Sequence, residues 1–182
     1  MANGTNSGGA GRLNPWRILC WGTAAALLLT PLVAMRFTSE VNWTASDFAF
    51  AGIMFGGVGA IYEFTVRRSN SNRYRAGVAF ALAAAFLTVW VNGAVGMIGD
   101  EGDPANLMFA GVLGIALAGS VLARFRARGM AIAMFAAALA QAIAGGVGMT
   151  IDPLGGVLSS AFAGLWLLSA ALFRSAAKVR EE

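Results

Sequence analysis

The sequence contains no histidine, one cysteine and few charged residues, and each shortage excludes some kinds of function. Without histidine there is no imidazole general base, no His-ligated haem and no histidine metal ligand. Cys20 alone can form neither an internal disulfide nor a multi-thiolate metal site. The chain also lacks the motifs of nucleotide-binding loops, serine hydrolases and zinc proteases. These absences predict a protein that binds no cofactor or metal and is not an enzyme.

Charge is scarce in the chain as a whole. Of its 182 residues only 12% are charged and 58% are apolar, whereas about a quarter of a soluble domain is charged. The mean hydropathy is correspondingly high, at +0.68, which indicates that the chain is solvated by a lipid bilayer. An isoelectric point near 10.2 can indicate a nucleic-acid partner. Because the basic residues flank apolar segments instead of forming one patch, we expect no nucleic-acid partner.

Six apolar segments are long enough to cross a membrane. Crossing about 30 Å of hydrocarbon at about 1.5 Å per residue takes about 20 residues. The segments are residues 16–35, 47–66, 76–98, 105–123, 130–150 and 154–173. In hydrocarbon a helix satisfies every backbone group within its own segment, and the alternating pattern of a membrane barrel is absent from the sequence.

The predicted fold is therefore an all-α integral membrane protein, with six transmembrane helices arranged as three up-down hairpins. The membrane domain covers residues 16–174. A disordered N-terminal tail, residues 1–15, precedes it, and a C-terminal tail, residues 175–182, follows it.

Lysine and arginine predict the orientation, because cytoplasmic loops are enriched in them. With a cytoplasmic N-terminus, Arg36 is the only basic residue on the outer side. The other twelve fall on the inner side: Arg12, Arg17, Arg67, Arg68, Arg73, Arg75, Arg124, Arg126, Arg128, Arg174, Lys178 and Arg180. This asymmetry predicts an even number of spans, with both termini in the cytoplasm. The general character of the sequence suggests the inner (plasma) membrane of a bacterium.

The chain also contains a possible internal repeat. A shift of 52 residues lays Gly77–Met97 on Gly129–Met149 with ten identical positions, and both copies lead into Asp-Pro, at Asp103-Pro104 and Asp152-Pro153. The first hairpin matches more weakly, at a shift of 59. We expect related hairpins, although a shared Ala- and Gly-rich composition is the alternative explanation.

Three polar residues inside apolar segments are candidate functional residues. Glu63 is the only carboxylate within such a segment, and an ionisable group in the membrane is a functional candidate. Arg67 follows four residues later, in the order that favours an interfacial helical ion pair over a proton relay. Asn92 and Gln141 lie deeper, where amides either bond a neighbouring helix or line a polar path.

Acids on the outer side have two possible roles. Asp103 and Asp152 stand where N-caps are expected, and Thr44 with Asp47 forms the pattern of a capping box. Alternatively, one acidic cluster could bind a divalent cation, although its spacing matches no calcium loop. The cluster consists of Asp100, Glu101 and Asp103.

Two hypotheses about function remain. Short loops and few deep polar residues favour a non-catalytic accessory or scaffold component. Its Gly-rich helix faces, such as Gly52-Ile53-Met54-Phe55-Gly56, could contact another membrane protein or a second copy. The alternative is a small transporter or channel for an ion or small solute, with Glu63, Asn92 and Gln141 lining the path. The two differ in whether these three side chains converge on one cavity.

Overall fold

The fold is all-helical in a computed structural model that describes residues 15–67 and 69–178. Within these ranges there are helices and no strand, which confirms the predicted class. Residues 1–14 of the predicted N-terminal tail and residues 179–182 of the predicted C-terminal tail lie outside the described residues. The chain divides into two compact units, one up to Gly59 and one from Ala60 onward, and we describe each by itself.

Five helical segments are long and apolar enough to cross a membrane. They are α2 (Ala45–Val66), α3 (Asn72–Ala94), the short 3₁₀ helix η1 (Pro104–Asn106) with α4 (Leu107–Leu122), α5 (Ala127–Gly148), and α6 (Pro153–Ala161) with α7 (Ala163–Lys178). The first helix, α1 (Pro15–Ala34), contributes a shorter apolar stretch, Trp21–Ala34. The predicted count of six spans therefore stays a prediction.

The first unit is built from α1 and most of α2. The backbone N–H of Thr44 donates to Oδ2 of Asp47 at 2.7 Å, and α2 begins directly afterwards at Ala45. This contact confirms the predicted capping-box pairing. Trp21 of α1 packs so closely on Gly59 that a Cβ there would lie 2.9 Å from the indole.

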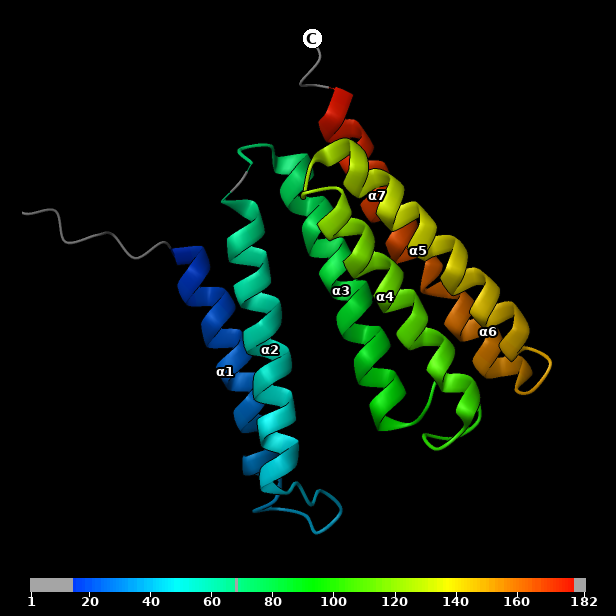
Figure 1. The fold of residues 1–182 in the computed structure, drawn as a ribbon. Helices are drawn as coiled ribbons and strands as arrows, with labels where there is room; N and C mark the ends of the chain where they lie inside the picture. Colours follow the sequence, from blue (N-terminus) through cyan, green and yellow to red (C-terminus); the bar gives the residue numbers. More distant parts are fainter. Residues whose placement is uncertain (1–14, 68, 179–182) are drawn as a thin grey trace, which may run out of the picture. The chain divides into compact units, whose positions relative to one another are not determined.

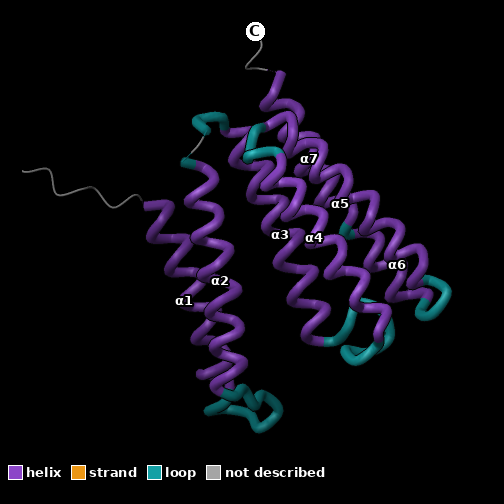
Figure 2. Tube along the Cα trace, in the orientation of Figure 1, coloured by secondary structure: helices purple, strands orange, loops and turns teal. Residues whose placement is uncertain are grey.

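The second unit contains α3 to α7. Helix α5 packs against α4, α6 and α7, and α3 packs mainly along α7. The turns 95–103 and 149–152 lie at one end of this unit, and the turn 123–126 lies at the other, with the end of α7 (Figures 1 and 2). Within the unit, the acidic turns and the basic turn are thus at opposite ends.

Two helices differ most from their predicted boundaries. Helix α3 spans Asn72–Ala94 instead of 76–98, because the Ser71 side chain caps its start and the chain turns after Ala94, with φ of +79° at Gly96. The predicted sixth span is divided at Phe162 into α6 and α7. The Ser160 hydroxyl donates to the Gly156 carbonyl at 2.8 Å, a contact that often bends helices.

The interior is made largely of small side chains. Alanine supplies about half of the buried apolar residues, and Phe109, Trp166 and Phe173 are the largest side chains among them. Many large aliphatic side chains face outward, such as Ile132, which is 70% exposed. Because lipid solvates apolar side chains, packing of small residues is what associates helices in a membrane.

The repeat remains a prediction. Asp103 and Asp152 both cap helix starts that carry Pro at the first positions, as a repeat requires. The hairpins nevertheless pack differently, since α5 lies along α6 and α7 whereas α3 makes few contacts with α4. In addition, α3 ends before Gly96, whereas α5 continues through the matching Gly148.

Candidate functional site

Asn106 is the most connected polar side chain in the second unit. Its Oδ1 accepts from the backbone N–H groups of Met97 at 3.0 Å and Ile98 at 2.9 Å. Its Nδ2 donates to the carbonyls of Ile98 at 3.1 Å and Asp100 at 2.6 Å. The side chain is buried and thus replaces water for four backbone groups of the turn 95–103. The sequence analysis missed it, although a polar residue three positions after an N-cap was a usable signal.

Asn92 and Gln141 belong to the same polar network. Asn92 Nδ2 donates to the Asn106 carbonyl at 3.4 Å, and Gln141 Nε2 donates to the Ser159 carbonyl at 2.9 Å. The Ser159 hydroxyl in turn donates to the Met97 carbonyl at 3.0 Å. The two amides are therefore linked through the turn 95–103, and they join α3 and α5 to α6.

Asp152 ties the same turn to the start of α6. Its Oδ1 accepts from the Gly155 N–H at 3.0 Å and its Oδ2 from the Gly99 N–H at 3.2 Å. These backbone hydrogen bonds lower the pKa of the Asp152 carboxyl below its ordinary value of 3.8, and the one from Gly155 has the largest effect. Asp152 thus stays ionised at neutral pH and holds the turns 95–103 and 149–152 together.

Four buried polar atoms have no hydrogen-bond partner among the described residues: Thr88 Oγ1, Asn92 Oδ1, Gln141 Oε1 and Trp166 Nε1. A hydroxyl, two amides and an indole can exchange hydrogen bonds with a neutral polar group. None of them gains or loses a proton near neutral pH. These four groups therefore cannot carry protons by titration.

Glu63 lies outside this network. Its Oε2 accepts from Arg67 Nη2 at 3.2 Å, and the Arg67 side chain is 71% exposed. The structure thus links Asn92 to Gln141 through Asn106, Met97 and Ser159, whereas Glu63 bonds its helical neighbour Arg67.

The outer acids act on nearby backbone. Asp100 Oδ1 accepts from the Gly102 N–H at 3.0 Å, and Asp103 Oδ1 accepts from the Ala105 N–H at 2.8 Å. The Glu101 side chain is exposed. Across the described part of the chain, no three Asp, Glu, Cys or His residues are grouped as ligands of a metal ion would be.

The second unit also contains a half-open apolar cavity of about 250 Å³. Its wall includes Val78 and Ala85 of α3, Leu113 of α4, Met134 of α5 and Trp166 of α7. The Ser120 hydroxyl lies on the wall but donates to the carbonyl of Ala116 in its own helix at 2.7 Å. The cavity suits a small apolar group and provides no charged contact.

Together, the five long apolar helices, the exposed aliphatic side chains and the core of small residues indicate a multi-pass membrane protein. The chain matches no family model, and the searches of curated proteins and of solved structures found no match. The role of the protein in the membrane must therefore be argued from its own residues.

Proposed function

We propose that the chain is a non-catalytic accessory or scaffold component of a bacterial inner membrane, with six spans and both termini in the cytoplasm. The observation that carries this proposal is what the deep polar side chains do. Asn92, Asn106 and Gln141 all bond backbone carbonyls or N–H groups of neighbouring segments. Their hydrogen bonds hold helices and turns together, as a structural component needs, and no nucleophile with a general base has been found in the chain.

The sixth span of this proposal is α1. The helix has 20 residues, which is the length that crosses about 30 Å of hydrocarbon. Its crossing keeps the basic segments on one side of the membrane and the acidic turns on the other.

A scaffold also needs a face for its partner, and α2 supplies one. Within the first unit, a Cβ added at Gly52 or Gly56 would meet no atom within 4 Å. These glycines let another helix backbone approach closely. We propose that a membrane-protein partner, or a second copy of the chain, packs on this face.

A photo-reactive amino acid at position 56, introduced in living cells, tests the proposed face. Position 50, about 120° around α2 from position 56 at about 3.6 residues per turn, is the matched control, because Phe50 is 45% exposed. We expect a covalent adduct with a protein from position 56 and only lipid adducts from position 50. Lipid adducts alone at both positions would contradict the scaffold proposal.

The second candidate is a transporter or channel, and the unpartnered buried atoms of Thr88, Asn92 and Gln141 favour it. In that case Asn92 and Gln141 would contact a small solute. Glu63 fits a proton path less well, because it is already paired with Arg67.

Proteoliposomes loaded with a pH-sensitive dye, or with labelled small solutes, separate the two candidates. If the protein is a scaffold, flux through wild-type vesicles equals flux through empty vesicles. If it is a transporter, wild type shows flux that the Asn92→Ala and Gln141→Ala variants lose while still folding. Glu63→Gln is the matched variant outside the network, and we expect it to change the free energy of unfolding by less than about 1 kcal/mol.

A further inference from the structure

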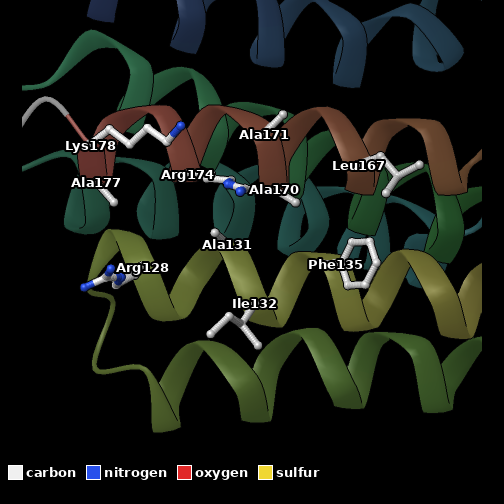
Figure 3. A pocket seen from close by; sticks show the side chains of 10 residues that line it. All are labelled: Arg128, Ala131, Ile132, Phe135, Leu167, Ala170, Ala171, Arg174, Ala177 and Lys178. Carbon is white, nitrogen blue, oxygen red and sulfur yellow. The ribbon is translucent and has the colours of Figure 1, made fainter.

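The α5–α7 pair carries an open groove of about 700 Å³ along its surface (Figure 3). Small side chains, including Ala131 of α5 and Ala171 of α7, form part of its lining. Because these side chains end at Cβ, an elongated apolar group can lie close to both helix backbones. The two helices are packed closely along their length, so both walls of the groove belong to a well-formed part of the second unit.

Three basic side chains gather towards one end of the groove. Arg128 comes from the first turn of α5, and Arg174 and Lys178 come from the last turns of α7. In Figure 3, Arg128 and Lys178 lie at this end, and the Arg174 guanidinium lies further along the groove, beside Ala170. Among the residues that the structure describes, those that line the groove include no aspartate or glutamate. This end therefore presents concentrated positive charge, which is complementary to an anion.

The other end of the groove is apolar. Phe135 and Leu167 lie there, away from the three basic side chains (Figure 3), and Ile132 lies between. Phe135 is 58% exposed and Leu167 is 45% exposed. From Arg128 to Phe135 is seven residues of α5, or about 10 Å at about 1.5 Å per residue.

We propose that this groove binds an anionic glycerophospholipid. The headgroup phosphate lies among Arg128, Arg174 and Lys178, and one acyl chain runs along the alanine-lined floor towards Phe135 and Leu167. The proposal rests on the membrane placement argued under the proposed function, but it does not depend on which side the termini face. Basic pockets between transmembrane helices are known places for anionic headgroups.

Helix dipoles account for only part of this charge pattern. Cations at the C-terminal end of a helix are favourable, which covers Arg174 and Lys178. Arg128 is at the N-terminal end of α5, where the dipole favours negative charge. An anion bound in the groove would interact favourably with Arg128.

Because the basic end of the groove continues into an apolar end, a phospholipid fits the groove better than other anions do. A free phosphate needs only the basic end of the groove. An acidic protein segment carries its charges in water and gains little from an apolar floor that faces the hydrocarbon. A phospholipid has an anionic head and an apolar chain joined in the order in which the groove presents basic and apolar side chains.

The test uses the full chain, purified in mild detergent and titrated with lipid in native mass spectrometry. Phosphatidylglycerol and phosphatidylcholine with identical acyl chains are compared, and glycerol 3-phosphate is the soluble competitor. Arg128→Gln, Arg174→Gln and Lys178→Gln are combined in one variant. The matched control combines Arg73→Gln, Arg124→Gln and Arg126→Gln, which remove equal charge from residues outside the groove lining. Ala171→Trp fills the groove and keeps every charge.

We expect wild type and the control to retain phosphatidylglycerol in preference to phosphatidylcholine. The groove variant should bind phosphatidylglycerol at least tenfold more weakly, since each basic residue contributes about fivefold, and Ala171→Trp should also weaken binding. Thermal unfolding of each variant checks that it is folded, and a variant that fails this check is replaced by its single substitutions.

Three results would overturn the lipid assignment: equal losses in the groove and control variants, equal retention of the two lipids, or displacement of phosphatidylglycerol by glycerol 3-phosphate. The third would assign the basic end to a free phosphate instead. None of these results bears on flux or on cross-linking from α2, so failure here is distinguishable from failure of the proposed function.

Discussion

Asn106 shows how one buried side chain can organise a turn. The turn 95–103 follows the end of α3, so its backbone groups are outside the helical hydrogen-bond pattern and need other partners. The Asn106 side chain accepts from two N–H groups and donates to two carbonyls, all between Met97 and Asp100. An amide is the side chain suited to this role, because it both accepts and donates.

We therefore predict that Asn106→Ala destabilises the protein by about 3 kcal/mol, since it leaves two buried N–H donors without partners at about 1–3 kcal/mol each. The measurement is the free energy of unfolding of the full chain in mixed micelles of mild detergent and dodecyl sulfate. Asn72→Ala is the control, because Asn72 is exposed at the start of α3. Equal effects of the two substitutions would contradict the role given to Asn106.

Asp152 makes the stability depend on pH at the acidic end. Its pKa is lower in the folded chain than its ordinary 3.8, so the unfolded chain takes up this proton first as the pH falls. The contribution of Asp152 is thus present above about pH 4 and is lost as the pH falls through the folded pKa. We predict that wild type has a higher unfolding temperature than Asp152→Asn at about pH 6, and that the difference shrinks towards about pH 3.

Thermal unfolding in detergent at a series of pH values measures this difference. The Asp152→Asn variant is the reference for wild type, because its position 152 has no ionisable group. The remaining carboxylates titrate equally in both proteins. A difference that stays constant, or that grows on acidification, would show that the hydrogen bonds to Gly155 and Gly99 do not favour the carboxylate.

At the scale of the element, the α5–α6 contact depends on glycine. A Cβ on Gly145 would lie 2.7 Å from the Ser160 nitrogen and 2.9 Å from the Gly156 carbonyl oxygen. Both are backbone atoms, which cannot move aside as the end of a flexible side chain can. The neighbouring Gly146 faces the other way, and a Cβ there meets nothing within 4 Å.

These adjacent glycines give a matched pair of variants. We predict that Gly145→Ala lowers the free energy of unfolding by about 2 kcal/mol, because overpacking a tight contact costs about 1–3 kcal/mol. Gly146→Ala should be neutral or slightly stabilising, since alanine has the higher helix propensity. The same mixed-micelle unfolding measurement applies to both. If Gly145→Ala were as stable as Gly146→Ala, α5 and α6 would not pack as closely as described.

At the scale of the whole molecule, the number of spans determines whether the two termini lie on the same side of the membrane. Six spans place both termini on one side, whereas five would place them on opposite sides. Alkaline phosphatase fusions at Glu40, at Gly102 and after Glu182, together with green fluorescent protein fused before Met1, distinguish these cases. We predict active enzyme at Glu40 and Gly102 and inactive enzyme after Glu182, because the basic residues hold the intervening segments in the cytoplasm.

Fusions to green fluorescent protein at the same positions are the complementary control, because this reporter fluoresces only when it stays in the cytoplasm. An active phosphatase after Glu182 would contradict both the span count and the orientation. We expect the N-terminal fusion to fluoresce, and a dark N-terminal fusion with an unchanged phosphatase pattern would show that α1 does not cross.

Much of the fold was predictable from the residues because the bilayer imposes one strong rule, that backbone groups in hydrocarbon bond within their own segment. Apolar length then located α2 and α5 to within a few residues. Capping chemistry is equally local, so Asp47 and Asp152 were assigned from their own neighbourhoods. The break at Phe162 and the early end of α3 were not predicted, because they depend on hydroxyl and glycine geometry within an apolar run.

By itself, the sequence determined the class of protein, the helical secondary structure and the separation of basic from acidic segments, because hydropathy, capping and charge act within one segment. Only the tertiary structure decided which polar groups meet. The linkage of Asn92 to Gln141 passes through Asn106, Met97 and Ser159. Arg128 of α5 and Arg174 of α7 line the same groove. Such meetings depend on how helices rotate and pack, and in lipid the outward-facing apolar side chains constrain that rotation only weakly.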